Sequence, residues 1–227
     1  RFLSLHLHMP VLEPSTFQEL KDWIKDGFEL SGASDLYVTY VVTTNQADGG
    51  GSVRCRPNLY PVLNHHQKTS LSSSTMPVER MVMIPPHTSL REATLPARFE
   101  RFLKGVRDRH LNRVEGLPVS GRAPVGFTAA GLSYCYLIQA LRELGLENRF
   151  PVLKWGVSYP LDEPLLTNFA AKVDHLIVVE EKREFLETQI TRALQRAHQE
   201  GRLARSPAIW GKRFPDDKEG IPSFRGL

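Results

Sequence analysis

The sequence APVGFTAAGLSYCYLIQALREL at residues 123–144 decides the fold, because an apolar run passes there directly into an amphipathic run. The same change occurs twice more before residue 194. The apolar runs are Ala123–Phe127, Phe150–Trp155 and His175–Glu180. The amphipathic runs are Leu132–Leu144, Glu163–Lys172 and Glu184–Leu194. Parallel strands need a crossover element that covers a face of the sheet, so this alternation predicts an α/β domain with a mainly parallel sheet flanked by helices.

Apolar residues recur at helical spacing in the first and last of these amphipathic runs. The core face predicted for the first helix is Leu132, Cys135, Ile138 and Leu141. The core face predicted for the last helix is Leu186, Ile190, Leu194 and Ala197. We expect this domain to cover residues 119–210, and residues 211–227, which are polar and rich in Pro and Gly, to form a linker to a missing domain.

A second α/β unit is predicted at residues 10–44. Pro10–Leu12 and Leu36–Thr43 have the composition of strands, and the second of them is expected to be buried. A helix lies between them, with Ser15 and Gln18 spaced as a capping box and Gly32 as its end. The apolar stripe predicted to be buried on this helix is Phe17, Leu20, Ile24 and Phe28.

Residues 49–118 are predicted to link the two units, so that the segments are 1–48, 49–118, 119–210 and 211–227. Gly49–Gly51 and Thr69–Thr75 indicate loosely packed chain. Val78–Ile84 fits a short strand or an extended link. A basic helix with Pro96 in its first turn is expected at about 96–114. Its apolar side is predicted to be Phe99, Phe102 or Leu103, Val106 and Leu111.

Composition excludes several classes of protein. The net charge of +4 is interspersed along the chain, so nucleic acid is not an expected partner. No apolar run reaches the roughly 20 residues that span a bilayer, and the start is too short and too rich in His for a secretion signal. The two cysteines, Cys55 and Cys135, give neither a disulfide framework nor an iron–sulfur motif. We expect a cytoplasmic protein, and a polypeptide cut from a longer one.

Candidate ligand or interface residues follow the predicted strands. Gly126–Gly131 forms a strand–turn–helix step, where Thr128 and Gly131 are ligand or interface candidates and the backbone N–H groups fit an anion. We favour the alternative that Ala130 and Gly131 only allow the helix to pack closely on the sheet. Glu180 and Glu181 follow the third apolar run, at the end of a strand where ligands of open α/β sheets gather. These carboxylates fit acid–base chemistry, an interface, or a cap on the helix that follows, and we favour the cap or the interface.

Thr43 and Thr44 close the strand of the first unit, where hydroxyl groups bind a ligand or, as we favour, cap a turn. His65–His66 and the pair His6 and His8 have no further ligands at useful spacing, so no metal site is predicted. No serine lies in a Gly-x-Ser-x-Gly elbow, which argues against a serine hydrolase.

Three stretches resemble the thiamine-diphosphate-dependent 2-oxoacid:ferredoxin oxidoreductases, and within them the indolepyruvate type, alpha subunit. MPVLEPSTFQELKDWIKDGFELS (9–31), with YVTYVVTT (37–44), resembles the end of the pyrimidine-binding domain. GFTAAGLSYCYLIQALRELGL (126–146) resembles the start of the middle domain, which is transketolase-C-terminal-like. FPVLKWGVSYPLDEPLLTNFAAKVDHLIVVEEKREFLETQI (150–190) resembles the rest of that domain and is the most specific stretch. The chain departs from the family at Asn45, where the family pattern has Arg after Thr-Thr.

The resemblance implies an enzyme that oxidatively decarboxylates a 2-oxoacid, such as an arylpyruvate, to an acyl-CoA. It implies thiamine diphosphate, Mg²⁺ and [4Fe–4S] clusters in the full enzyme, with ferredoxin and coenzyme A as partners. The motifs that hold these groups are missing from the sequence, so no catalytic residue and no cofactor is assigned to this chain. We expect the isolated chain to be inactive.

Within such an enzyme, residues 119–210 are predicted to be a structural scaffold that contacts other domains or subunits in a homo- or hetero-oligomer. One alternative is a non-catalytic α/β assembly or binding module. Another is the C-terminal region of a transketolase or of a 2-oxoacid dehydrogenase beta subunit. Fold likeness alone does not separate these functions.

Overall fold

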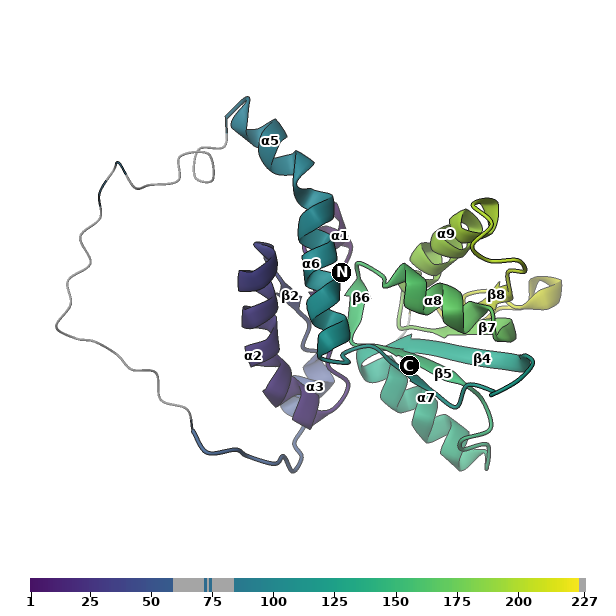
Figure 1. The fold of residues 1–227 in the computed structure, drawn as a ribbon. Helices are drawn as coiled ribbons and strands as arrows, with labels where there is room; N and C mark the ends of the chain where they lie inside the picture. Colours follow the sequence, from purple (N-terminus) through teal and green to yellow (C-terminus); the bar gives the residue numbers. More distant parts are fainter. Residues whose placement is uncertain (59–71, 73, 75–83, 225–227) are drawn as a thin grey trace.

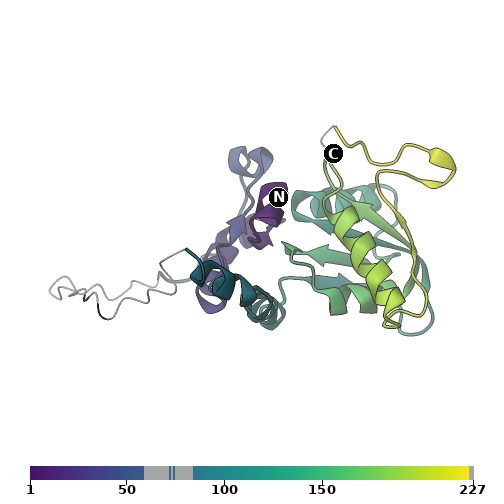
Figure 2. The ribbon, with the colours of Figure 1, turned by 90° about the horizontal axis from the view of Figure 1, so that it is seen from above.

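The computed structural model describes residues 1–58, 72, 74 and 84–224, and these form two sheets with their helices (Figure 1). The predictions for Thr69–Thr75, Val78–Ile84 and His65–His66 fall outside the described residues, apart from Ser72, Ser74 and Ile84. Seen from above, the unit built on the smaller sheet lies beside the unit built on the larger one (Figure 2). No helix among the described residues is long and apolar enough to cross a bilayer.

The larger sheet has the strand order β3-β5-β4-β7-β8. Its strands are β3 (Arg113–Glu115), β4 (Ala123–Ala130), β5 (Val152–Trp155), β7 (Val173–Val179) and β8 (Ala208–Trp210). Neighbouring strands are parallel, except that β3 is antiparallel to β5. The α/β fold with a mainly parallel sheet, predicted from the alternation of apolar and amphipathic runs, is therefore confirmed.

Helices cover both faces of this sheet, with α7 (Gly131–Glu143) on one face and α8 (Glu163–Ala170) and α9 (Leu186–Gln199) on the other (Figure 1). The predicted core face of α9 is confirmed, because all four residues are buried. The core face predicted for α7 is only partly right. Leu141 is buried and Ile138 packs beside it, but Leu137 takes the place of Leu132 and Cys135. The side of α7 that carries Cys135 faces the N-terminal unit instead, where the thiol donates to the Ser15 carbonyl oxygen at 3.3 Å.

The smaller sheet has the order β2-β1-β6 and contains β1 (Val11–Leu12), β2 (Thr39–Tyr40) and β6 (Val157–Tyr159). Strands β1 and β2 are parallel and are joined by α2 (Phe17–Ser34), which confirms the strand–helix–strand unit. The strand expected at Leu36–Thr43 is wrong in length, because only two of its residues pair. The short helices of this unit are α1 (Phe2–His6), α3 (Thr44–Asp48) and α5 (His87–Ala93).

Helix α2 differs from its prediction at both ends. Thr16, not Ser15, is the N-cap, and its hydroxyl accepts from the Glu19 N–H. The Glu19 carboxylate in turn accepts from the Ser15 N–H at 2.9 Å. The helix continues past Gly32 to Ser34 and ends where Asp35 adopts a left-handed conformation with φ of 59°.

The buried face of α2 is also not the predicted one. The residues of α2 that are buried are Glu19, Trp23, Gly27, Leu30 and Ser34. The predicted stripe lies on another side of the helix, where Ile24 is 51% exposed and Phe28 is 79% exposed. The packing against α6 (Leu95–Asp108) selects Leu30, because Gly105 has no side chain and lets the two helices approach closely.

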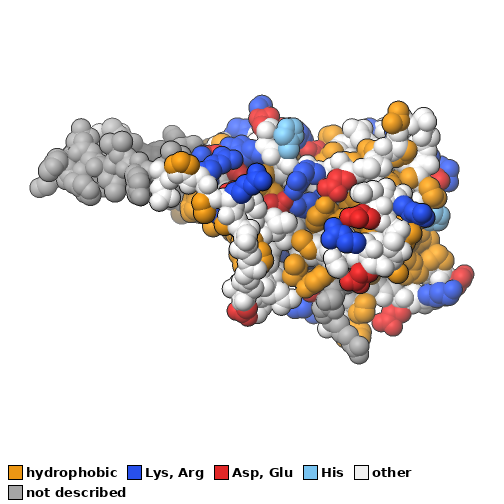
Figure 3. Space-filling model, turned by 90° about the horizontal axis from the view of Figure 1, so that it is seen from below, with side chains coloured by type: hydrophobic (Ala, Val, Ile, Leu, Met, Phe, Trp, Pro, Cys, Tyr) orange, Lys and Arg blue, Asp and Glu red, His pale blue; other side chains and the backbone are white. Residues whose placement is uncertain are grey.

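Helix α6 begins with Pro96 in its first turn, as expected, and buries Phe102, Leu103 and Val106. It ends at Asp108, earlier than predicted, because the chain turns at Arg109 and His110 and then enters strand β3. Basic and acidic side chains alternate over the face seen from below, in keeping with the interspersed charges of the sequence (Figure 3).

One continuous stretch of chain joins the two sheets. Strand β5 belongs to the larger sheet, and after Gly156 the chain continues as β6 in the smaller sheet. The Asn112 side-chain oxygen accepts from the N–H groups of Gly156 and Val157 at 3.0 and 2.9 Å. A Cβ atom at Gly156 would overlap the Leu111 carbonyl oxygen, so only glycine fits this crossing. The predicted segment limits at 118 and 210 stay predictions.

Residues 211–224, predicted to be a linker, are anchored to the larger unit. They contain the short helix η2 (Pro215–Asp217) and an antiparallel bridge between Arg213 and Glu219. The Lys212 N–H donates to Glu187, and its ammonium donates to the Glu180 carbonyl oxygen at 2.7 Å.

Candidate functional site at the carboxyl edge of the larger sheet

The candidate site lies where β4, β5 and β7 end, because ligands of open α/β sheets bind beyond these carboxyl ends. Gly131, Gly156 and Glu180 directly follow the three strands. The segment Val11–Ser15 (VLEPS) lies against this edge, and the Glu13 N–H donates to the Gly156 carbonyl oxygen at 2.8 Å. The N-terminal unit thus covers part of the edge at which a ligand would be expected.

The Glu13 carboxylate is the centre of this contact and is 2% exposed. The Arg1 guanidinium donates to one of its oxygens at 2.6 Å, and the buried Ser158 hydroxyl donates to the other. A Cβ atom at Gly131, where φ is +53°, would lie 3.2 Å from the Glu13 oxygen. Gly131 is the first residue of α7, whose N-terminus favours negative charge. The structure thus packs a carboxylate of the chain itself against Gly131, at the step where the sequence left open an anion or closely packed neighbours.

A second ionic contact lies beside the first. The Lys154 ammonium, 1% exposed, donates to Glu19 at 2.5 Å, and Arg113 donates to the same carboxylate oxygen. The ammonium also lies 4.7 Å from the ring centre of Tyr134 and 5.7 Å from that of Trp23. Burial lowers the pKa of Lys154, while the hydrogen bond to Glu19 opposes this shift.

The Cys135 thiol and the Tyr134 phenol beside Lys154 favour their protonated forms. Burial raises the pKa of the Cys135 thiol. Burial and the neighbouring Glu115 carboxylate raise the pKa of Tyr134 to about 12, and the Tyr134 hydroxyl donates to Glu115 at 3.0 Å. A thiolate or phenolate is the reactive form of these groups, so the surroundings suit structural contacts better than nucleophilic chemistry.

The three threonine candidates lie in different places. Thr43 caps α3 through a capping box with Gln46, and the Gln46 amide donates to the Pro14 carbonyl oxygen at 2.8 Å. Thr44 is the exposed first residue of α3. Thr128 is fully buried, where its hydroxyl donates to the Leu153 carbonyl oxygen and accepts from the Trp155 indole at 2.8 Å.

Glu180 acts as the cap of α9. Its buried carboxylate accepts from the N–H groups of Phe185, Leu186 and Glu187 at 3.0, 2.8 and 3.0 Å. Burial raises the pKa of Glu180, and the three backbone N–H groups oppose the shift. The Glu180 carboxylate is therefore bonded within the chain, whereas Glu181 lines a pocket.

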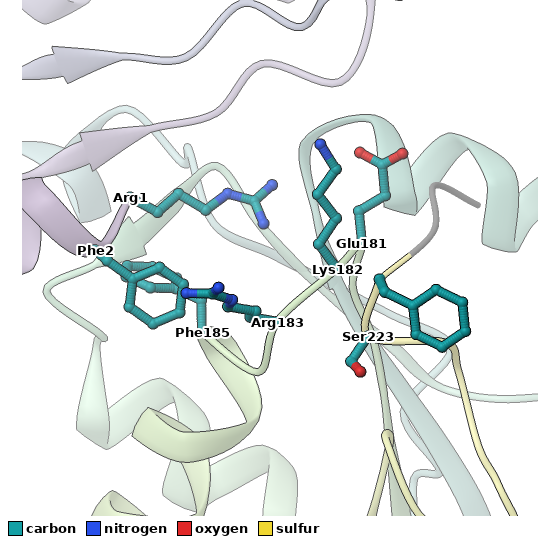
Figure 4. A pocket seen from close by; sticks show the side chains of 8 residues that line it. Arg1, Phe2, Glu181, Lys182, Arg183, Phe185 and Ser223 are labelled. Carbon is teal, nitrogen blue, oxygen red and sulfur yellow. The ribbon is translucent and has the colours of Figure 1, made fainter.

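That pocket has a volume of about 500 Å³ and lies beside the start of α9 (Figure 4). Its wall combines cationic and aromatic side chains. The lining residues are Arg1, Phe2, Glu181, Lys182, Arg183, Phe185, Ser223 and Phe224. Phe2 packs edge-on against the buried Phe185 with ring centres 5.3 Å apart. Lys182 and Arg183 are cations that suit an anionic group, while Arg1 is paired with Glu13 and Glu181 adds a carboxylate to the wall.

The structure therefore brings Gly131 to a carboxylate and places Glu180 and Glu181 beside one another, but it does not gather the six candidates into one site. Their assignment as ligand or interface residues stays a prediction. The sequence reasoning missed Glu13, Glu19 and Lys154. A lysine within the apolar run Phe150–Trp155 was the available signal, since a charge in a buried strand requires a partner.

Comparison with known proteins finds sequences that are similar to most of this chain. The family model of the indolepyruvate oxidoreductase domain matches residues 116–216. Indolepyruvate oxidoreductase subunit IorA of Pyrococcus abyssi is 32% identical over 190 residues, which cover 84% of this chain and 28% of the relative. The corresponding subunit of Archaeoglobus fulgidus is 31% identical over 195 residues, which cover 86% of this chain and 29% of the relative. The chain thus spans less than a third of these relatives.

Among solved structures, this chain is similar to the 2-oxoglutarate:ferredoxin oxidoreductase from Magnetococcus marinus, a structure with 2-oxoglutarate, coenzyme A and succinyl-CoA bound. The similarity has a TM-score of 0.35 and 19% sequence identity. It covers 61% of this chain and 21% of that one.

Proposed function

We propose that this chain, which resembles the IorA subunits of the indolepyruvate oxidoreductases, is part of a 2-oxoacid:ferredoxin oxidoreductase of the arylpyruvate type. In this proposal the full enzyme decarboxylates its substrate with thiamine diphosphate and passes electrons to ferredoxin in the cytoplasm. Residues 119–210 hold the VLEPS segment in place and form contacts with other domains or subunits. The observation that carries the scaffold role is the buried Glu13 contact at the carboxyl edge of the larger sheet.

The residues that the structure describes do not fit the cofactors of such an enzyme. Within residues 1–58 and 84–224, no group of three His, Cys, Asp or Glu side chains is placed to hold a metal ion. Cys55 and Cys135 are too few for a [4Fe–4S] cluster, which requires four ligands. The turn before α7 packs against the Glu13 carboxylate. Thiamine diphosphate, Mg²⁺ and the clusters are therefore assigned to other parts of the enzyme.

A second candidate role concerns the pocket beside Glu181. Lys182, Arg183 and three phenylalanine rings in one wall suit a ligand that has both an anionic and a planar group, and coenzyme A has both. A contact with coenzyme A or with a neighbouring subunit is consistent with this wall.

Purification of the tagged polypeptide from its own cells tests the main proposal. We expect its intact mass to exceed that of the 227-residue chain, and thiamine diphosphate and iron to purify with it. We also expect the complex to reduce ferredoxin with indolepyruvate and coenzyme A, and the 227-residue chain alone to show no turnover. Binding of thiamine diphosphate to the 227-residue chain alone, or a purified complex that lacks thiamine diphosphate, would contradict the proposal.

A further inference from the structure

Strand β8 is attached to the larger sheet by a side-chain hydrogen bond as well as by its backbone. The Trp210 indole N–H donates to Nδ1 of His175, on the neighbouring strand β7, at 3.0 Å. In the register of the two strands Ile177 lies beside Trp210, so Trp210 and His175 project from the same face of the sheet. Because β8 has three residues and is the last strand in the sheet order, few backbone bonds accompany this contact.

This hydrogen bond exists only while the His175 ring is neutral. An indole N–H is a donor and never an acceptor, so Nδ1 of His175 has to offer its lone pair. In a protonated imidazole both nitrogens carry hydrogens, and two N–H groups would then face each other across 3.0 Å. The ring centres lie 6.4 Å apart and the ring planes differ by 23°, so the rings meet edge to edge. The face of the indole therefore offers the cation no compensation.

The charged groups on the elements around His175 are bonded to other partners. They are Arg122, Arg142, Glu143, Glu147, Asp174, Arg205 and Lys212. Asp174 points to the opposite face of β7 and is paired with Arg122 at 2.8 Å. The cross-strand neighbours of His175, Val125 on β4 and Ala208 on β8, are uncharged. A proton on the exposed His175 ring therefore meets no counter-charge among these groups.

We propose that His175 and Trp210 form a pH-sensitive latch between β7 and β8. Histidine is the side chain that ordinarily changes its charge between about pH 5 and 8. At the upper end of this range the bond forms and holds β8 to β7. As the pH falls, His175 takes up a proton, the indole N–H loses its acceptor, and β8 loses its side-chain bond to β7.

The position of the latch gives it an effect beyond the two rings. Strand β8 leads directly into residues 211–224, which supply part of the wall of the pocket beside Glu181. The latch thus sets how firmly the start of this segment is tied to the sheet. Both rings belong to the larger unit and the contact is made entirely within this chain, so the latch is independent of the proposed enzymatic role.

Nuclear magnetic resonance of the 227-residue chain, labelled with nitrogen-15, tests the proposal between about pH 5 and 8. We expect the Trp210 indole N–H resonance to move as the pH falls. After correction for the intrinsic exchange rate, the protection of the β8 amides that pair with β7 should fall about five- to tenfold, as for the loss of one hydrogen bond. The Trp155 indole N–H is the internal control, because it donates to the buried Thr128 hydroxyl, which does not titrate, and its resonance should stay in place.

His175→Asn separates the latch from other effects of acid. The asparagine oxygen occupies the δ position, as Nδ1 does, and accepts at every pH, so the bond and the protection of β8 should persist to the acid end of the series. His198→Asn is the matched control, because Nδ1 of His198 is also hydrogen-bonded, to the Leu203 carbonyl oxygen, and this variant should keep the original pH response. A Trp210 resonance and β8 protection that do not change with pH, a response that persists in His175→Asn, or one that His198→Asn abolishes would each overturn the proposal.

Discussion

Removing the charge of Glu19 by Glu19→Gln should be among the most destabilising changes in this chain. The substitution keeps the size of the side chain but leaves the Lys154 ammonium, 1% exposed, without its counter-charge. Breaking a buried ion pair from one side costs about 3–5 kcal/mol, because the remaining charge stays desolvated. The rings of Tyr134 and Trp23 near the ammonium offset part of this cost, so we expect about 3 kcal/mol.

Replacing the other partner of the pair, by Lys154→Met, should cost less free energy of unfolding. It leaves the Glu19 carboxylate with Arg113 and with the Ser15 N–H, and the methionine fills the space of the lysine stem. We expect a loss of about 1–2 kcal/mol, close to that of one lost hydrogen bond to a charged group. The double variant should lose roughly 2 kcal/mol less than the sum of the single variants, because neither charge then stays alone.

Urea unfolding followed by circular dichroism measures these free energies. Lys104→Met is the matched control, since Lys104 pairs with Asp108 on the surface, where both side chains are more than half exposed. We expect this control to change the stability by less than about 0.5 kcal/mol. The description of Glu19 and Lys154 as a coupled buried ion pair would be refuted by either of two results. One is that Glu19→Gln costs no more than the control, and the other is that the loss in the double variant equals the sum of the losses in the single variants.

Further predictions concern single residues. Gly131→Ala should lower the free energy of unfolding by about 2 kcal/mol, because its Cβ would lie 3.2 Å from a Glu13 oxygen. Gly145→Ala is the control: it is also at positive φ but in open space, and it should cost about 1 kcal/mol in the same urea-unfolding assay. Glu180→Ala should cost about 2–3 kcal/mol, since three N–H groups of α9 lose their acceptor; Glu200→Ala, at the other end of α9, should cost under about 0.5 kcal/mol in the same assay. The pKa of Tyr134 is raised to about 12 in the folded chain, so unfolding releases a proton from this group between about pH 10 and 12, and stability falls as pH rises through that range. Tyr134→Phe should make this fall less steep in a series of unfolding curves at increasing pH. An unchanged slope would contradict the prediction.

Periodicity predicted the fold well where an element packs on one side only. Helix α9 buries one apolar face, and the four residues chosen from the sequence are the buried ones. Helix α2 has apolar residues on two sides, with Trp23 and Leu30 on one and Ile24 and Phe28 on the other. Amphipathic spacing does not say which side meets the core, and the glycine at position 105 of α6 decides it.

The site was predictable only in outline. The sequence left open whether an anion or closely packed neighbours face the step before Gly131, because strand–turn–helix geometry is local and fits both. It did not indicate that Glu13 supplies the anion, since the two residues are far apart in the chain. The same holds for Lys154 and Glu19, whose contact spans 135 positions. Such pairs depend on how two units dock, and one sequence carries no local signal for docking.

The docking also sets a limit on what the carboxyl edge of the larger sheet can bind. A ligand at the step before Gly131 has to displace Glu13, and with it the bonds from Arg1 and Ser158 and the bond from the Glu13 N–H to Gly156. At roughly 1–2 kcal/mol for each bond, displacement costs about 3–6 kcal/mol. A factor of ten in affinity corresponds to about 1.4 kcal/mol, so a ligand would bind there about a hundredfold to ten-thousandfold more weakly than at a vacant edge. The edge of the sheet beyond β4 and β5 is thus occupied here by the contact between the two units.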